Sequence, residues 1–400
     1  MEQLSRTSSL ESAPSAEVIP PRSRLHFIDN LRWTMIMLVV SMHAAVTYSH
    51  VGRWYYVEGS RPALPVLLVF ATYQAFLQAF FMGFLFFLAG YFVPGAYDKK
   101  GSAKFLRDRF IRLGIPTLLY MFVIGPFTEY YVSRTWTSTR PMTFGGEIVK
   151  HILNGQFLSG TGPLWFCAAL LFFCLAYALF RQFAPAPSRF TIATALPGNR
   201  GIVAFIALLA LATFLVRIPE PMGKAVYNMQ LCFFSQYIFM FCAGILAYRT
   251  RFLTRLPYSF GIRWLWFGLA GGFVLWIAVL ALGGALSGKI DLYNGGLHWQ
   301  SAGFSVWESL VCAGVCLGLT VLYRQKFNTN GPVAKVLTDN AFAIYVLHPP
   351  VLIAISHALQ PFEAPPLIKF VVLTILAFTA TLALSALVVR RIPGLKTILS

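Results

Sequence analysis

The sequence predicts an all-α, polytopic membrane protein with about ten transmembrane helices in one bundle. Three observations lead to this prediction. Apolar residues make up 57% of the 400 residues and charged residues only 12%. Hydrophobic stretches of membrane-spanning length recur from residue 28 to near the C-terminus, which is not the pattern of a soluble domain. Most of the 32 Lys and Arg residues fall in short segments between these stretches, where they orient the helices in the membrane. The formal net charge of +18 is explained in this way, so we expect no nucleic-acid partner.

Each expected span is an apolar run that ends at polar or charged residues. The second run is long enough to include a tilted or interfacial turn, and the fifth is short. The expected bounds are 28–48, 64–93, 112–131, 163–183, 201–216, 231–248, 263–286, 303–323, 341–359 and 367–389. Ten spans put both termini on one side, and the segments on that side carry most of the Lys and Arg. The positive-inside rule therefore places both termini in the cytoplasm, with the protein in the inner (cytoplasmic) membrane of the cell, surrounded by lipid.

The chain is expected to form a single membrane domain. Residues 1–24 are rich in Ser, Pro and charge and have few aromatics, which predicts a disordered cytoplasmic tail. A cleaved signal peptide fits poorly, because this segment is long and polar and the first apolar run is of full spanning length. Residues 25–391 are predicted to form the transmembrane domain and 392–400 a cytoplasmic C-terminal tail. No internal repeat is visible.

The first span contains an ionisable residue at membrane depth. Arg32 lies near its start and His43 follows eleven residues later. At about 100° per residue, this spacing brings both side chains to within roughly 20° of the same helix face. Ionisable groups within a membrane are costly and usually line a cavity or a reaction path. The alternative is a histidine that only makes a hydrogen bond at a helix interface.

Two arginines follow the second span. Arg109 and Arg112 are three residues apart, so an α-helix would project them from one side at the cytoplasmic boundary. Two planar guanidinium groups suit a phosphate-bearing ligand, because each forms paired hydrogen bonds with phosphate oxygens. The alternative is that they flank a spanning helix only because topology requires basic residues there.

The six cysteines all fall in apolar spans. They form no CxxC pair and have no interleaved histidine at zinc-ligand spacing, so they read as small buried hydrophobic residues. We therefore expect no metal site.

Five segments, in order along the chain, resemble the signatures of the acyltransferase type 3 family of integral membrane acyltransferases. The opening IDNLRW with its HAAVTYS continuation looks closest to the subgroup near glucan biosynthesis protein C, which is associated with succinylation of periplasmic glucans. The segments are Ile28–Trp33 with His43, Phe84–Phe92 (FLFFLAGYF), Arg109–Arg112 (RFIR), Gly162–Phe166 (GPLWF) and Asn340–His348 (NAFAIYVLH).

The resemblance implies an O-acyltransferase. It would move an acetyl or succinyl group from cytoplasmic acyl-CoA, a co-substrate, to a hydroxyl of an envelope glycan or related acceptor, and no cofactor is expected to stay bound. A hydroxyl attacks a thioester poorly until its proton is removed, and a neutral imidazole is the usual general base near pH 7. His43 is the candidate base, in the outer half of the membrane.

The donor is expected to approach from the cytoplasm, with its phosphates at Arg109 and Arg112. Arg32 would hold a phosphate or line the path of the donor arm; otherwise it is a membrane-edge anchor or a partner of Asp29. Asp29 would then orient Arg32 or cap the helix. His348 is expected in the cytoplasmic half of its span, just before a helix break at Pro349 and Pro350, either on the donor path or as a structural residue.

Two further residues have both functional and structural interpretations. Trp165 is a donor-binding candidate that would stack on a base or sugar ring, although an interfacial tryptophan at the start of a span is common. Glu308 lies in the outer half of its span, where it would orient the histidine, bind the acceptor, or serve as a protonated or paired structural residue.

The main alternative function is a transporter or flippase that moves a glycan intermediate or an anion without chemistry. Intramembrane His and Glu residues suit a proton relay equally well. The arginine pair favours the enzyme, because a permease needs no cytoplasmic phosphate site, and the sequence shows no pseudo-repeated halves. A non-catalytic scaffold would leave the intramembrane ionisable residues without a function.

Overall fold

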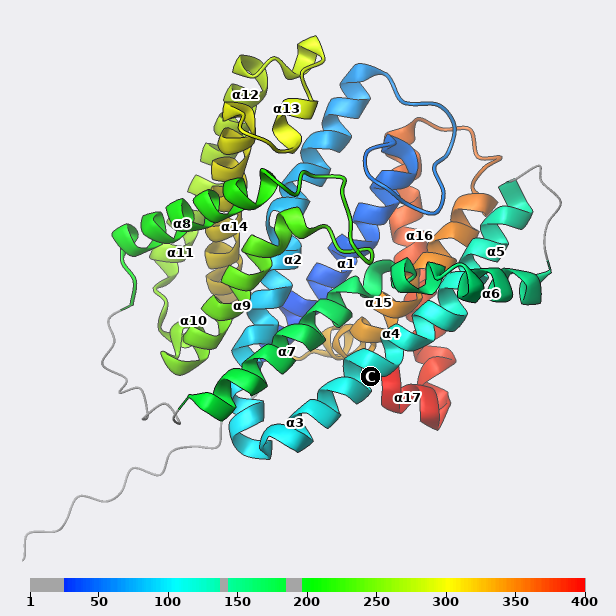
Figure 1. Cartoon of the computed structure of the whole chain (residues 1–400), viewed down its shortest axis with the longest axis horizontal. Coiled ribbons are helices and arrows are strands. Elements are labelled where there is room, and N and C mark those ends of the chain that lie inside the picture. Colours follow the sequence, from blue (N-terminus) through cyan, green and yellow to red (C-terminus); the bar gives the residue numbers. More distant parts are fainter. Residues whose placement is uncertain (1–24, 137–142, 185–195, 400) are drawn as a thin grey trace, which may run out of the picture.

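The computed structural model describes residues 25–136, 143–184 and 196–399, so the predicted tail at 1–24 lies outside the described residues. In these ranges the chain is helical, and the β-pairing recorded there is an isolated bridge between Val226 and Met229. Ten helical segments of the described chain are long and apolar enough to cross a membrane, which confirms the predicted fold class (Figure 1).

Each predicted span corresponds to one of these ten segments, and most segments extend a few residues beyond the predicted bounds. The segments are His26–Ser49 (α1), Leu64–Lys100 (α2), Ser102–Trp136 (α3 to α5), Gly162–Phe183 (with α7), Asn199–Arg217 (α8), Leu231–Arg249 (with α9), Tyr258–Ser287 (with α11 and α12), Trp299–Lys326 (α14), Pro332–Ala358 (α15) and Pro366–Arg391 (with α16).

Several of these segments contain more than one helical element, and short helices lie between or after them. The individual bounds are Ser102–Arg109 (α3), Ile115–Leu119 (α4), Gly125–Trp136 (α5), Phe144–Leu153 (α6), Trp165–Phe183 (α7), Phe234–Arg249 (α9), Phe252–Arg255 (α10), Tyr258–Trp266 (α11), Gly272–Leu282 (α12), Asp291–Asn294 (α13), Pro366–Leu387 (α16) and Pro393–Leu399 (α17). Because the spans alternate in direction, residues 25 and 399 lie on one side, called the terminal side below, and the opposite side is called the far side.

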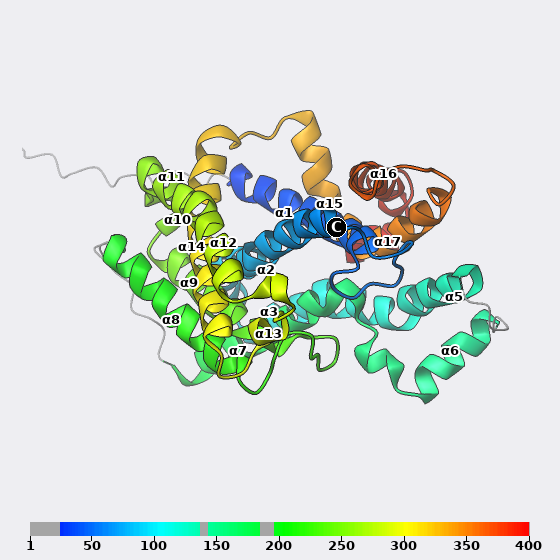
Figure 2. The same cartoon turned by 90° about the horizontal axis from the view of Figure 1, so that it is seen from above.

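Helices α1, α2 and α14 form the centre of the bundle. About 78% of the most apolar window of α2 and of α14 is buried, against 22% for the spans at Tyr258–Ser287 and Pro366–Arg391. The α2–α9 contact is close because glycines face the other helix: a Cβ at Gly90 or Gly244 would collide with the backbone of the partner. Figure 2 shows α1 and α2 near the middle, with α8, α11 and α16 around them.

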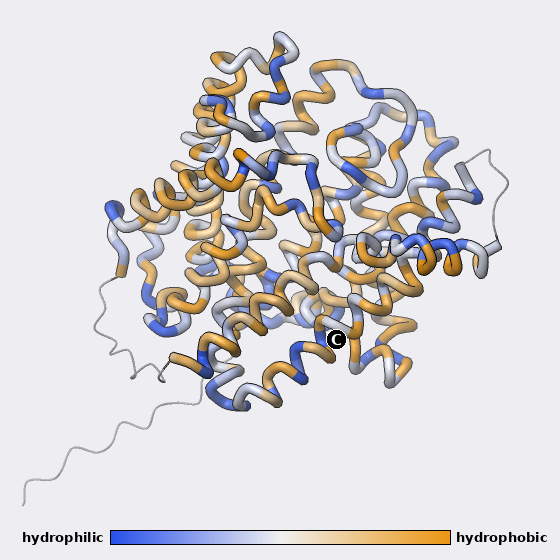
Figure 3. Tube along the Cα trace, viewed as in Figure 1, coloured by the Kyte–Doolittle hydropathy of each residue, from blue (hydrophilic) through white to orange (hydrophobic). Residues whose placement is uncertain are grey.

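The peripheral spans carry long apolar faces. Phe180, Leu208, Val274 and Ile375 are all exposed, and a soluble protein rarely exposes apolar surface on this scale. Figure 3 shows hydrophobic residues along the spans and hydrophilic ones mainly at their ends and in the loops. These faces therefore contact lipid. Cys242, which was expected to be buried, is also exposed, whereas the other five cysteines are buried.

The predicted break in the ninth span is wrong, because α15 continues as a helix through Pro349 and Pro350. Proline at position 349 has no N–H to donate to the carbonyl of Tyr345, four residues earlier. That carbonyl is satisfied instead by Nδ1 of His348, at 2.8 Å. A side-chain donor thus replaces the missing backbone donor, as happens in other membrane helices that contain proline.

Candidate active site

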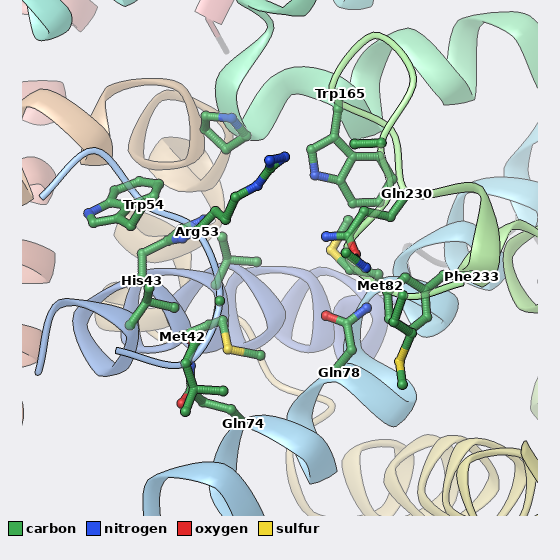
Figure 4. A pocket seen from close by; sticks show the side chains of 18 of the residues that line it. Met42, His43, Arg53, Trp54, Gln74, Gln78, Met82, Trp165, Gln230 and Phe233 are labelled. Atoms are coloured by element: carbon green, nitrogen blue, oxygen red, sulfur yellow. Dashed lines mark hydrogen bonds between the residues drawn. The ribbon is translucent and has the colours of Figure 1, made fainter. Parts of the chain in front are cut away.

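The far side of the bundle contains a cavity of about 820 Å³. Its floor and walls come from α1, α2, α9 and α14, and its rim comes from far-side connections at 51–55, 159–163 and 222–230. Three predicted site residues line it: His43, Trp165 and Glu308. Figure 4 shows His43 and Trp54 on one side of the cavity and Trp165 with Phe233 across from them.

His43 lies beside two other rings. The indole of Trp54 stacks on the imidazole with ring centroids 3.8 Å apart and planes 16° apart. The ring of His348, on α15, lies 5.2 Å from His43 at an interplanar angle of 17°. His43 therefore belongs to a group of three nearly parallel aromatic rings at the edge of the cavity.

His348 is fully buried beside His43. The sequence predicts a position in the terminal half of the span, and this prediction is wrong. The difference arises because α15 begins at Pro332, nine residues before the predicted start, so His348 lies past the middle of the helix. A carbonyl oxygen only accepts hydrogen bonds, so Nδ1 of His348 must carry the proton that it donates to Tyr345. In the neutral ring, Nε2 then has a free lone pair.

Polar atoms without hydrogen-bond partners collect in this ring group. Nδ1 of His43, Nε1 of Trp54 and Nε2 of His348 are all buried, and none has a partner within the described residues. Buried polar atoms are nearly always satisfied, and exceptions are concentrated at sites with a functional role. The ring group therefore has hydrogen-bonding capacity that the rest of the described chain does not use.

The connection between α1 and α2 is held at two points. Near its start, the side-chain amide of Gln74 donates to the Val51 carbonyl at 3.0 Å. Farther along, the backbone N–H of Glu58 donates to the carbonyl of Thr47 at 2.8 Å, and the Glu58 carboxylate forms a largely buried ion pair with Lys369 of α16. These contacts hold the loop that places Trp54 over His43.

Glu308 forms an ion pair with Arg217, a residue that the sequence analysis did not include. Arg217 is the last residue of α8; its Nη2 lies 2.5 Å from Oε2 of Glu308, and both side chains are almost completely buried. The guanidinium also contacts the rings of Phe233 and Phe304, with each ring centroid 5.3 Å away. This pair agrees with the paired structural role considered for Glu308. No hydrogen bond joins it to His43 in the described ranges, and acceptor binding remains a prediction.

The rest of the wall combines aromatic rings with amides. Trp165 stacks near Tyr237 with centroids 5.5 Å apart. The amide side chains that line the cavity are Gln74, Gln78, Asn228, Gln230 and Asn294.

Tyr55, on the loop above His43, also faces the cavity and shares a 3.0 Å hydrogen bond with Tyr120. Burial raises the pKa of Tyr55 to about 12. The phenol therefore keeps its proton at neutral pH and is available as a donor.

The predicted donor-binding arginines lie outside the cavity. Arg32 is 3.5 Å from the carboxylate of Asp29 and lies over the ring of Phe92 at 4.8 Å, in agreement with the expected Asp29 partnership. The guanidinium of Arg109 lies over Phe105 at 5.1 Å.

The spacing argument for Arg109 and Arg112 has to be corrected. Helix α3 ends at Arg109, and a π-helical turn, Phe110–Gly114, carries Arg112. A π-turn has a different number of residues per turn from an α-helix, so the interval of three does not place the two side chains one above the other. Arg112 is exposed and Arg109 is half-buried.

Comparison with known proteins gives a family. A family model described as an acyltransferase domain matches residues 25–390, nearly the whole described chain. No curated protein and no solved structure matches the chain. Since the match covers all ten spans and the ring group around His43, the chain belongs to the acyltransferase type 3 family of membrane acyltransferases.

Proposed function

We propose that this membrane acyltransferase transfers an acetyl or succinyl group from acyl-CoA to a hydroxyl of an envelope glycan or related acceptor, with His43 as the general base. The observation that supports this most strongly is the ring group. It combines a histidine at the edge of a large cavity, a second histidine in a fixed tautomer, and three buried polar atoms that have no partner among the described residues.

In the proposed reaction, the imidazole of His43 takes the proton of the acceptor hydroxyl as its oxygen attacks the thioester carbonyl. The new C–O bond forms, the C–S bond breaks, and the departing CoA thiolate recovers the proton from the histidinium. His348 acts as a positioning residue. Its ring is held in one tautomer by the Tyr345 carbonyl and lies 5.2 Å from the ring of His43, so it packs beside the base and helps to keep it in place.

The cavity wall is suited to a saccharide acceptor. Aromatic faces such as those of Trp165 and Trp54 offer apolar surface to the C–H face of a sugar ring, and the amides offer both donors and acceptors to hydroxyl groups. The cavity opens among far-side connections, which agrees with an acceptor that approaches from the side opposite the termini.

The donor is proposed to bind from the terminal side, with its phosphates near Arg109, Arg112 and Arg32. Arg32 and His43 are both on α1, separated by roughly 16 Å along the axis at 1.5 Å per residue. A donor held at Arg32 would have to extend its thin arm along α1 to bring the thioester to His43.

The experiment is transfer by the purified protein in lipid nanodiscs. Acetyl-CoA or succinyl-CoA is supplied with an oligoglucose acceptor, and mass spectrometry measures ester formation on the sugar and release of free CoA thiol. We expect one acyl ester for each thiol released, and the added mass identifies the acyl group. A transporter would release no thiol and form no ester, so the absence of both products with every donor and acceptor would overturn the proposed function.

A further inference from the structure

Arg53 is a cation in the cavity that the sequence analysis did not single out. It belongs to the loop between α1 and α2, directly precedes Trp54, and lines the cavity with an exposed side chain. Figure 4 shows its guanidinium extending from the His43 side into the space toward Trp165. No hydrogen bond or ion pair is recorded for it in the part of the chain that the structure describes.

No ion pair joins Arg53 to an acidic residue of the wall in the described chain. The lining includes two carboxylates, Glu308 and Glu129. Glu308 is committed to Arg217 at 2.5 Å. The nearest recorded partner of Glu129 is Nδ1 of His151, at 3.7 Å, and that ring is charged only when it is protonated. The positive charge of Arg53 is therefore available to an anionic ligand in the cavity.

The backbone that carries Arg53 is held in place. Val51, two residues before it, is bonded to Gln74, and Trp54, the next residue, is stacked on His43. Glu58 closes the loop through Lys369. A cation on a fixed backbone loses less conformational entropy on binding a ligand than one on a free loop.

We propose that Arg53 binds a carboxylate of a substrate while that substrate is at His43. This inference rests on the proposed function. A guanidinium offers paired, parallel hydrogen bonds to such a group, which gives orientation as well as charge neutralisation. Arg53 is next to Trp54 in the sequence, and Trp54 stacks on the ring of His43. An anion held by Arg53 would therefore lie close to the site of acyl transfer. It belongs either to the far end of a dicarboxylic acyl group or to an acidic acceptor.

The test compares four substrate pairs in nanodiscs. Acetyl-CoA and succinyl-CoA are each combined with an oligoglucose and with its counterpart carrying one glucuronic acid. The variants are Arg53→Ala, Arg53→Lys and the matched control Arg61→Ala, an exposed arginine of the same loop that does not line the cavity.

For pairs that carry the recognised anion, Arg53→Ala is expected to raise KM about 10- to 100-fold with little change in kcat, as for loss of a charged hydrogen bond. Arg53→Lys should recover part of the affinity, because an ammonium keeps the charge but not the paired geometry. Arg61→Ala should match the wild type.

The pattern across the pairs identifies the source of the anion. A KM effect confined to succinyl-CoA assigns the anion to the acyl group, and one confined to the glucuronate assigns it to the acceptor. An equal effect on all four pairs, or none, overturns the role of Arg53 while leaving the transferase function standing.

Direct binding provides a readout that does not depend on turnover. Quenching of tryptophan fluorescence, with Trp54 and Trp165 in the cavity wall, gives a Kd for the glucuronate-bearing sugar, for its neutral counterpart and for free succinate. A preference for the acidic ligands that Arg53→Ala removes and Arg61→Ala retains supports the inference even if no pair is turned over. Equal Kd values for acidic and neutral ligands in the wild type contradict it.

Discussion

His43→Ala is expected to lower kcat for acyl transfer by about 10²- to 10⁴-fold, the usual contribution of a positioned general base. The variant should still insert in the membrane and fold, because His43 is only partly buried and makes no hydrogen bond with its ring in the described chain. His43→Gln, which keeps most of the side-chain volume, should be similarly slow. Mass spectrometry of envelope glycans from cells that express each variant measures the ester, and the released CoA thiol measures the rate in vitro.

A variant of His348 is tested in the same experiment. His348→Asn keeps a donor near the position of Nδ1, facing the Tyr345 carbonyl, but removes the Nε2 lone pair. We expect a smaller fall in kcat than for His43→Ala and a shift in the pH dependence of kcat. The double variant should be no slower than His43→Ala alone, because residues that act as a unit are not additive.

His357 is the matched control for His348. It lies on the same helix, α15, outside the cavity lining, and its Nδ1 is hydrogen-bonded to Tyr131 at 2.9 Å. His357→Ala should leave the pH profile unchanged. Added imidazole should restore part of the activity of His43→Ala, since the cavity extends to this position. Wild-type ester content in the His43 variants would remove His43 from the mechanism.

The ten spans were predictable because the signal is local. A run of about 20 apolar residues is long enough to cross the hydrocarbon core whatever it packs against. The position of His43 at a cavity followed from the same logic, since intramembrane ionisable groups mark such places, whereas the position of Trp165 across from it was not predicted.

The pairings inside the site were not predictable in the same way. Arg217 ends an apolar run, where an arginine ordinarily anchors a helix at the interface, and only the tertiary structure shows that it turns inward to Glu308. The clue in the sequence was a second intramembrane charge of opposite sign at a comparable depth. Arg53 gave no local signal, because it sits in a polar loop whose fold depends on contacts with α2 and α16.

His348 shows how a small error in a helix boundary moves a functional residue. A span that starts at 341 instead of Pro332 places His348 in the terminal half, at a different depth from His43. Pro349 predicts a break because it removes a backbone donor. The consequence of that missing donor is a fixed histidine tautomer at the site, which only the contact with Tyr345 reveals.

Breaking the Arg217–Glu308 pair is expected to be the most destabilising single change in the bundle. Glu308→Ala leaves a guanidinium with no exposed surface and no acidic partner, and Arg217→Ala leaves an equally buried carboxylate. Removing one partner of a buried pair typically costs about 3–5 kcal/mol, because the remaining charge has lost both water and its counter-ion. Unfolding of the protein in bicelles by SDS titration measures the loss.

The double variant Arg217→Met/Glu308→Leu distinguishes the pair's structural contribution from a catalytic one. Apolar side chains of similar volume leave no buried charge, so the double variant should be more stable than either single variant, with a coupling free energy of about 3 kcal/mol or more. Additive losses would show that the two residues do not depend on each other.

Activity of the double variant then gives the role of Glu308. If Glu308 only neutralises the charge of Arg217, the double variant should keep the shape of the cavity. It should then transfer acyl groups at close to the wild-type kcat, with a similar KM for the acceptor. If its carboxylate, which lines the cavity, also contacts the acceptor, the double variant will be stable and yet show a raised KM for the sugar. Stability and KM therefore separate the two roles that the sequence left open, and only a rise in KM in a stable double variant makes Glu308 part of the acceptor site.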